Sequence, residues 1–335
     1  GIKKKMSWAL GILLILGSSQ LTAAQKCYGL ALEGGGSRGA YEAGALWGLT
    51  NNLPANETLW NIITGISTGG LNAGGFSQFP YGQEKAASQF LVDVWTNITG
   101  DSDIYVDWPM GKAQGILFES GIYNNAPLKK LVASLIQTGA QRNISIGSTD
   151  LDAGELHRFT ETFPDLATTV IATSSAPFVF PTHDINGTTY SDGGDTVNLD
   201  IFAAIERCEQ IVGDDRDIVM DMIFLEPGFL SEVNLTDSWS VHDVKSRVSE
   251  LRQYYHKSWY ILSARIAHPN VHYRYVIQPA QDLPGGLIPL NFTHSNIMDM
   301  LNLGIEDATK MVNGATTFRA DNYREALTSR RFISE

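Results

Sequence analysis

The chain has 335 residues, 43% hydrophobic and 18% charged, which fits a folded protein of one large or two small domains. Its 32 glycines and 12 prolines show no period, and two cysteines cannot form a framework, so collagen-like and disulfide-scaffold proteins are excluded. The net charge of −12 excludes nucleic acid as an expected partner and gives no overall attraction to an anionic membrane.

Residues 1–24 have the pattern of a secretory signal peptide. Three lysines at positions 3–5 precede an apolar run at 8–17, and small and polar residues lead to Ala24, where cleavage is expected. The run is too short for a membrane-spanning helix, which needs about 20 apolar residues. We therefore predict a mature protein of residues 25–335 with no stable membrane span.

Sequons for N-glycosylation also favour secretion. The chain has six, where its composition would give roughly two or three by chance. Cys27 and Cys208 can pair in an oxidising compartment, although two separate buried thiols fit the sequence equally well. The predicted location is extracellular or the lumen of the secretory or endolysosomal pathway. The candidate glycosylation sites are Asn56, Asn97, Asn143, Asn186, Asn234 and Asn291.

The first half of the mature chain alternates predicted strands and helices. Residues 28–33 and 60–64 are apolar runs of strand length, while residues 40–52 and the segment from Thr68 have helical patterns. This order indicates a parallel βαβ unit with a right-handed crossover. Further helices are expected over 83–96 and 127–137.

The second half is richer in predicted strands. Residues 143–151 and 156–160 flank a turn, and Asn186-Gly187 joins strands at 181–185 and 188–191. Strands over 218–225 and 271–277 are separated by a long helical pattern at 241–266, and a last helix is expected over 296–312. No repeat or linker interrupts the pattern, so we predict one α/β domain.

A glycine-rich loop follows the first predicted strand and precedes the first helix. Its backbone N–H groups can hold an anion. The loop also fits the G-x-G-x-x-G of dinucleotide-binding folds, but those need an acidic residue at the end of the second strand, where this chain has Ser67. We therefore favour an oxyanion hole built from Gly34, Gly35, Gly36, Ser37, Arg38 and Gly39.

A G-x-S-x-G sequence follows the second predicted strand. In Gly65-Ile66-Ser67-Thr68-Gly69 the serine would occupy a strained turn that exposes its hydroxyl. Residues 35–39 match the same pattern around Ser37. Both loops leave the carboxyl edge of one βαβ unit, so one can stabilise an oxyanion while the other supplies the nucleophile. The triple glycine suits the oxyanion role, which makes Ser67 the favoured nucleophile and Ser37 the alternative.

A third motif, Ser191-Asp192-Gly193-Gly194, closes the predicted hairpin. An aspartate before two glycines is most often only a turn. Its functional interpretation is a general base. A carboxylate can act in this way if it is partly desolvated and directed at the serine hydroxyl.

The three motifs resemble those of the patatin-like phospholipases, which are lipid acyl hydrolases with a Ser-Asp dyad. GGGSRG, GISTGG and SDGG occur in the family's order, and the segments at 148–155 and 172–194 are also similar. The similarity covers residues 28–209 and is diffuse over 210–335. Family members often have Asn-x-Pro after the aspartate, whereas this chain has Asn198-Leu199-Asp200.

The resemblance implies a three-layer α/β/α domain with a mainly parallel sheet. It implies Ser67 as nucleophile, with Gly65 and Gly69 flanking it, and Asp192 as general base, followed by Gly193 and Gly194. No metal or cofactor is implied. The expected activity is that of a secreted phospholipase A-type enzyme, which cleaves acyl esters of glycerolipids through an acyl-enzyme.

A glycerolipid substrate implies that the protein makes transient contact with a lipid surface. The aromatic side chains considered for that contact are Trp47, Phe76, Phe79, Trp108, Phe118 and Phe178.

Two alternatives stay open. A Ser-Asp-His triad of the α/β-hydrolase type needs a histidine after Ser67 and Asp192 in the chain. A non-catalytic lipid-binding or storage protein could also use the same scaffold. The histidines in the permitted order are His242, His256, His268, His272 and His294.

Overall fold

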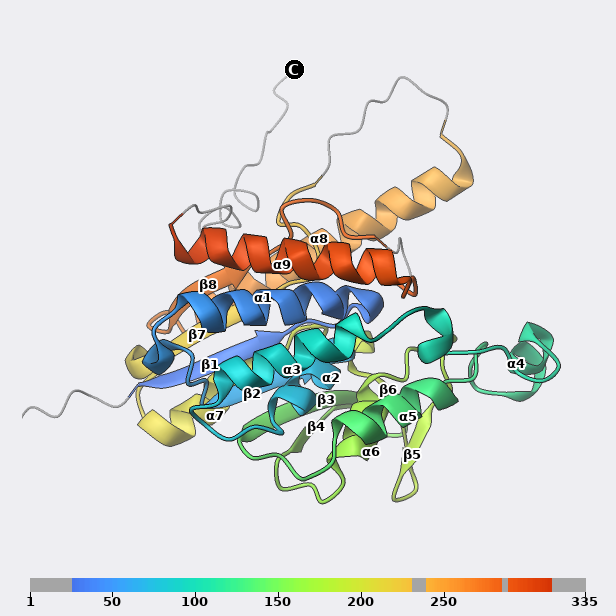
Figure 1. Ribbon diagram of the computed structural model, residues 1–335, viewed down its shortest axis with the longest axis horizontal. Helices are drawn as coiled ribbons and strands as arrows, with labels where there is room; N and C mark the ends of the chain where they lie inside the picture. Colours follow the sequence, from blue (N-terminus) through green and yellow to red (C-terminus); the bar gives the residue numbers. More distant parts are fainter. Residues whose placement is uncertain (1–25, 231–238, 285–288, 315–335) are drawn as a thin grey trace, which may run out of the picture.

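The computed structural model describes residues 26–230, 239–284 and 289–314 (Figure 1). These residues form one eight-stranded sheet covered by helices on both faces. The predicted three-layer α/β/α fold with a mainly parallel sheet is therefore confirmed. The predicted signal peptide and the sequon at Asn234 lie outside the described residues.

The strand order is β5-β6-β3-β2-β1-β7-β8, with β4 also paired to β3. Strands β3, β2, β1, β7 and β8 are parallel to their neighbours in this order, whereas β4, β5 and β6 are antiparallel. Parallel neighbours end at the same edge of the sheet, so the loops after β1 and β2 meet there. The strands are β1 (Cys27–Leu32), β2 (Ile62–Ile66), β3 (Asn143–Asp150), β4 (Glu155–Thr160), β5 (His183–Ile185), β6 (Thr188–Asp192), β7 (Ile218–Ile223) and β8 (His272–Ile277).

Two main hydrophobic cores lie between the sheet and its helices, and a third cluster of four buried residues lies around β4, β5 and β6. Leu30 and Leu32 face the larger core, while Ala31 between them faces the smaller one, as expected for alternation along a strand. The larger core lies under α1 (Gly39–Asn52), α2 (Thr68–Phe76), α3 (Glu84–Thr96), α5 (Ala126–Leu135), α6 (Leu166–Thr173) and α9 (His294–Val312). The smaller core lies under α7 (Ile201–Val212) and α8 (Val241–Ala267). The short helix α4 (Lys112–Phe118) projects from one side of the molecule (Figure 1).

Three helices were not predicted from the sequence. Helix α6 has the sequence LATTVIAT, whose β-branched residues favour strand by propensity, so its packing against β3 overrides local preference. Helix α7 carries a start signal, because the Asp200 side chain accepts a hydrogen bond from the backbone N–H of Ala203 at 3.1 Å. Helix α4 is only about two turns long, too short to show the helical spacing of apolar residues in its sequence.

A disulfide joins Cys27 at the start of β1 to Cys208 in α7, which settles the pairing that the sequence left open. Both residues are fully buried in the smaller core, with Cα atoms 5.5 Å apart. The bond links the first strand of the sheet to the helix that covers it, across 181 residues of sequence.

We predict that the double substitution Cys27→Ser/Cys208→Ser lowers the free energy of unfolding by about 2–5 kcal/mol, because the unfolded chain loses a long cross-link. Denaturant unfolding of the oxidised protein and the variant measures the difference. A reducing agent should destabilise the natural protein and leave the variant unchanged. Equal unfolding midpoints would contradict the prediction.

Candidate active site

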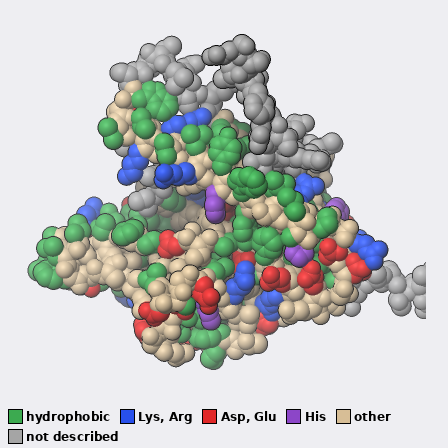
Figure 2. All heavy atoms as spheres, turned by 180° about the vertical axis from the view of Figure 1, so that it is seen from behind, with side chains coloured by type: hydrophobic (Ala, Val, Ile, Leu, Met, Phe, Trp, Pro, Cys, Tyr) green, Lys and Arg blue, Asp and Glu red, His purple; other side chains and the backbone are tan. Residues whose placement is uncertain are grey.

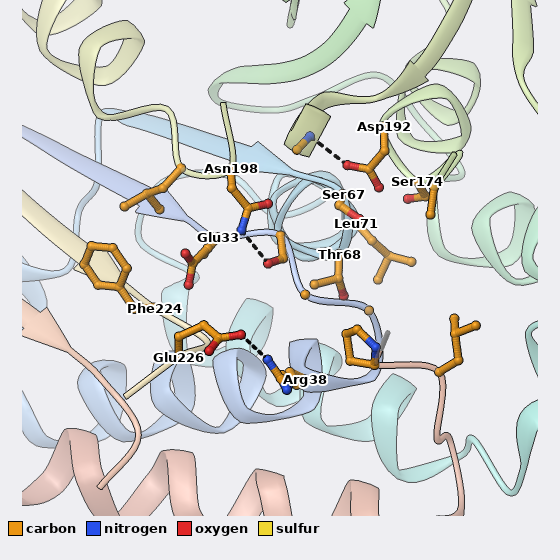
Figure 3. Close-up of a pocket in the computed structure, with 18 of the residues that line it drawn as sticks. Glu33, Arg38, Ser67, Thr68, Leu71, Ser174, Asp192, Asn198, Phe224 and Glu226 are labelled. Atoms are coloured by element: carbon orange, nitrogen blue, oxygen red, sulfur yellow. Dashed lines mark hydrogen bonds and ion pairs between the residues drawn. The ribbon is translucent and has the colours of Figure 1, made fainter. Parts of the chain in front are cut away.

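Three loops meet at the carboxyl edge of the sheet, around a pocket of about 1010 Å³. The glycine loop follows β1, Ser67 follows β2, and Asp192 ends β6. In Figure 3, Ser67 and Asp192 lie together on one wall, and Glu33 and Glu226 lie on the other side of the pocket. The three sequence motifs, which span residues 34–194, therefore form one site.

Ser67 sits on a strained strand-to-helix turn, as the G-x-S-x-G motif predicts. Its φ of 52° and ψ of −121° are rare for a residue with a side chain and cost about 1–3 kcal/mol. A Cβ at Gly65 would collide with the backbone of Gly69, and one at Gly69 would collide with the carbonyl of Leu32. The flanking glycines thus let the start of α2 lie directly against the ends of β2 and β1, and Ser67 lines the pocket.

Thr173 at the end of α6 holds this turn in place. Its Oγ1 accepts a hydrogen bond from the Ser67 N–H at 2.8 Å and donates one to the carbonyl of Gly147 in β3 at 2.5 Å. Thr173 was not among the site residues predicted from the sequence. The only feature of the sequence that could have pointed to Thr173 is its position in the segment 172–194, which resembles the family named above.

The Asp192 carboxylate is buried and close to the Ser67 hydroxyl. Burial raises its pKa from 3.8 to about 7, although the neighbouring Ser67 side chain and the hydrogen bond from the Gly194 N–H oppose the shift. The Gly194 bond is 2.8 Å long and fixes the carboxylate orientation. A carboxylate with this pKa suits general-base chemistry near neutral pH. Its burial supplies the desolvation that an aspartate needs to act as a general base.

Two amides of the glycine loop are available to an oxyanion. Within the described residues, the N–H groups of Gly35 and Gly36 have no hydrogen-bond acceptor, and both residues line the pocket. The N–H groups of the other four predicted residues already donate to backbone carbonyls. Contrary to the prediction, these four groups hold the loop together and are not available to an oxyanion. These are Gly34 to Asn198 at 3.0 Å, Ser37 to Pro289 at 2.9 Å, Arg38 to Gly35 at 3.1 Å, and Gly39 to Gly36 and Ser37.

Asn198 clamps the glycine loop to the loop that follows Asp192. Its backbone carbonyl accepts from the Gly34 N–H, and its Nδ2 donates to the Gly34 carbonyl at 3.0 Å (Figure 3). A Cβ at Gly34 would collide with the Asn198 amide, so the first glycine of the loop is required for this contact. In the sequence, Asn198 is distinguished only by the missing proline two residues after it.

A charged cluster supports the glycine loop from the side of α8. Arg38 forms an ion pair with Glu226, and Lys257 donates to the carbonyls of Glu226 and Pro227, each at 3.0 Å. Glu33 is buried, and its burial raises its pKa to about 7 despite the opposing charge of Lys257. Burial also lowers the pKa of Lys257. The cluster ties the loop to α8 and to the end of β7.

Ser37, the alternative nucleophile, is fully buried and does not line the pocket. Of the histidines whose side chains are described, His256 lines the pocket, yet none contributes to the pKa shift of Asp192 or forms a hydrogen bond with Ser67. His268 pairs with Glu209 at 3.1 Å, and His294 lies 3.3 Å from the carbonyl of Ile98. The side chain of His242 lies outside the described residues.

Four predicted glycosylation sites are exposed, namely Asn56, Asn97, Asn186 and Asn291, and Asn143 is half-buried. Across residues 26–230, 239–284 and 289–314, no three His, Cys, Asp or Glu side chains are grouped as metal ligands would be.

A family model described as patatin-like phospholipase matches residues 30–205. No curated protein matches the chain. Among solved structures, VipD from Legionella pneumophila is similar, with 12% sequence identity and a TM-score of 0.36, over 87% of this chain and 67% of that one.

We predict that kcat/KM for ester hydrolysis rises with pH through an apparent pKa of about 7, because Asp192 must lose its proton to act as a base. Asp192→Asn should abolish this rise together with the activity. Glu33 has a similar pKa, so Glu33→Gln is the control and should keep the rise. A rise centred near pH 4 would contradict the assignment.

The raised pKa of Asp192 also predicts how the stability of the protein depends on pH. A carboxyl whose pKa is raised by folding stabilises the native state at low pH, and this stabilisation is lost as pH increases from 3.8 to about 7. The melting temperature of Asp192→Asn relative to the natural protein should therefore rise over that interval. A constant difference would count against the buried carboxylate.

We predict that Asn198→Ala lowers kcat by about 10- to 100-fold with little change in KM, because the free amides of the glycine loop lose their alignment. Steady-state kinetics on a soluble ester measure kcat and KM separately. Asn61→Ala is a matched control, since Asn61 Oδ1 accepts from the Tyr28 N–H at the other end of β1. If both variants lose stability but keep kcat, Asn198 has no positioning role.

Proposed function

Because this chain belongs to the patatin-like phospholipase family, we propose that it is a secreted phospholipase A-type lipid acyl hydrolase. In this proposal Ser67 is the nucleophile and Asp192 acts on it directly as general base. The observation that carries the proposal is the buried Asp192 carboxylate, whose pKa of about 7 is set by burial and by the neighbouring Ser67 hydroxyl.

Acylation would begin with attack of Ser67 Oγ on the ester carbonyl carbon while Asp192 takes the hydroxyl proton. The carbonyl oxygen becomes an oxyanion, which the N–H groups of Gly35 and Gly36 can stabilise. When the tetrahedral intermediate collapses, the bond to the glycerol oxygen breaks and Asp192 returns the proton to that oxygen. The products are a lysolipid and an acyl-Ser67 ester.

Deacylation would use the same groups with water in place of the serine. Asp192 takes a proton from water, whose oxygen attacks the acyl carbonyl at the same oxyanion site. The second intermediate collapses with release of the fatty acid, and Ser67 regains its proton from Asp192. Both steps need only the two side chains and the loop amides.

The apolar side of the pocket supports a long acyl chain as the substrate group. It is formed by α2, α3, α5 and the segments around 104, 180 and 292, whose apolar side chains line the same pocket as Ser67. Its larger side chains include Leu71, Trp95, Ile104, Leu131, Phe180 and Phe292.

The side of the pocket formed by α8 supports a phosphate-bearing headgroup. Arg252, His256 and Tyr260 lie on one face of this helix at i, i+4 and i+8 and all line the pocket. Arg252 has no ion-pair partner among the described residues, and a guanidinium is a preferred ligand of phosphate. This polar wall favours a phospholipid over a neutral lipid.

Secretion is supported by three independent features. The N-terminal signal-peptide pattern, the exposed sequons and the buried disulfide all fit an oxidising compartment, where disulfides persist. Among the described helices none is both long and apolar enough to cross a bilayer.

We predict that the mature protein releases fatty acid from phospholipid micelles and that a fluorophosphonate labels Ser67. Ser67→Ala and Asp192→Asn should each lower the rate by about 10⁴-fold or more, as loss of a nucleophile or its base does in serine hydrolases. Released fatty acid and peptide mass spectrometry measure the two effects.

His256→Ala is the control for the triad alternative, because this histidine lines the pocket. Its rate should stay within a few-fold of the natural protein. If a histidine proves indispensable, the site is a triad and not a dyad. Labelling at Ser37 would overturn the assignment of Ser67 as the nucleophile. If no lipid releases fatty acid, a lipid-binding protein would be favoured over an enzyme.

A further inference from the structure

Helix α8 presents a stripe of large hydrophobic side chains to solvent. Their spacing of three, four or seven residues keeps them on one side of the helix over its whole length. Val241 is 87% exposed, Trp259 59% and Ile266 68%, far above the exposure of a core residue. The stripe consists of Val241, Val244, Val248, Tyr255, Trp259 and Ile266.

The stripe points away from the body of the protein. The opposite side of α8 is buried against the smaller core through Ser258, Ile261 and Ala264, each no more than 1% exposed. Between the two sides lies the face with His256 that lines the pocket. A surface placed on the stripe would therefore lie beside the pocket opening.

The charge of α8 is opposite in sign to that of the whole protein. The helix has five basic and two acidic residues, a net charge of +3, in a chain whose total is −12. Lys245 and Arg252 have no ion-pair partner among the described residues, and Lys245 is exposed on the edge of the stripe. A basic helix with an apolar stripe is typical of helices that lie in a membrane interface.

A second exposed hydrophobic cluster lies across the pocket on α4 and its neighbours. Figure 2 shows hydrophobic side chains gathered on α4 and on α8, with a hollow between them. Phe178 is 81% exposed and follows Pro177, which lines the pocket. The other members are Met110, Ile116, Leu117 and Phe118, each at least 65% exposed.

Only two of the aromatic residues that the sequence suggested for lipid contact belong to this cluster, Phe118 and Phe178. Phe76 is fully buried, and Trp47, Phe79 and Trp108 are half-buried.

We propose that the α8 stripe and the α4 cluster seat the pocket opening on an anionic lipid bilayer. The stripe would enter the acyl-chain boundary, while Lys245 would contact anionic headgroups. A lipid surface fits better than a protein because the two hydrophobic regions flank a pocket that must receive a lipid. The identity of the surface rests on the proposed function, whereas binding itself does not require catalysis.

Binding is measured by co-sedimentation with vesicles of phosphatidylcholine, alone or mixed with phosphatidylserine. Val244→Ser/Val248→Ser/Trp259→Ser should weaken binding to both vesicles by about tenfold or more. Lys245→Glu should weaken binding to the mixed vesicles by about fivefold or more and leave binding to phosphatidylcholine unchanged. None of these four residues lines the pocket, so hydrolysis of a soluble short-chain ester should be unchanged.

Matched controls lie away from the two hydrophobic regions. Ile211→Ser changes an exposed apolar residue of α7 near the start of β7, at the opposite edge of the sheet, and Lys85→Glu reverses an exposed charge at the start of α3. Both should bind vesicles as the natural protein does. Ser67→Ala should also bind normally, which separates a failure of catalysis from a failure of docking.

Two results would overturn the proposal. One is equal vesicle binding by the triple stripe variant and the natural protein. The other is conversion of a dimer to a monomer by the stripe substitutions with no change in vesicle binding, which would make a second copy of the chain the partner of this surface.

Discussion

Burial of the Asp192 carboxylate beside Ser67 is the constraint on which the rest of the site depends. An exposed aspartate is too weak a base to activate a serine, and this site has no imidazole in contact with either residue among the described side chains. The carboxylate must therefore be desolvated and still be held in one orientation. The Gly194 N–H fixes the carboxylate, and the Thr149 hydroxyl holds the Asp192 carbonyl at 2.9 Å.

The sheet provides this geometry through the register of its strands. Leu32 lies opposite Gly65, so the glycine loop and the Ser67 turn start side by side, and β6 places Asp192 opposite Ser148 of β3. Buried contacts stabilise both loops, because Thr173 holds the strained Ser67 turn and Asn198 holds Gly34 of the glycine loop. The disulfide and α7 secure β1 from the opposite face.

The sequence predicted most of the fold and identified the two residues of the proposed dyad, because strand and helix periods and the glycine motifs are local features. The Asn186-Gly187 hairpin and the βαβ unit were correct for that reason. Contacts made across the chain were not predictable: Thr173 reaches Ser67 over 106 residues, and Asn198 reaches Gly34 over 164. The positive charge of α8 was also not predicted, because the net charge of −12 for the whole chain does not reveal a local excess of lysine and arginine.

The most direct test of the proposed dyad is a titration of the Asp192 carboxyl itself, followed by ¹³C NMR of protein labelled at aspartate and assigned with Asp192→Asn. We predict a midpoint at about pH 7 in the natural protein. In Ser67→Ala the midpoint should be higher, because the ionised carboxylate loses the neighbouring hydroxyl that lowers its pKa. A midpoint near the ordinary value of 3.8, or no effect of Ser67→Ala, would contradict direct base action of Asp192 on Ser67.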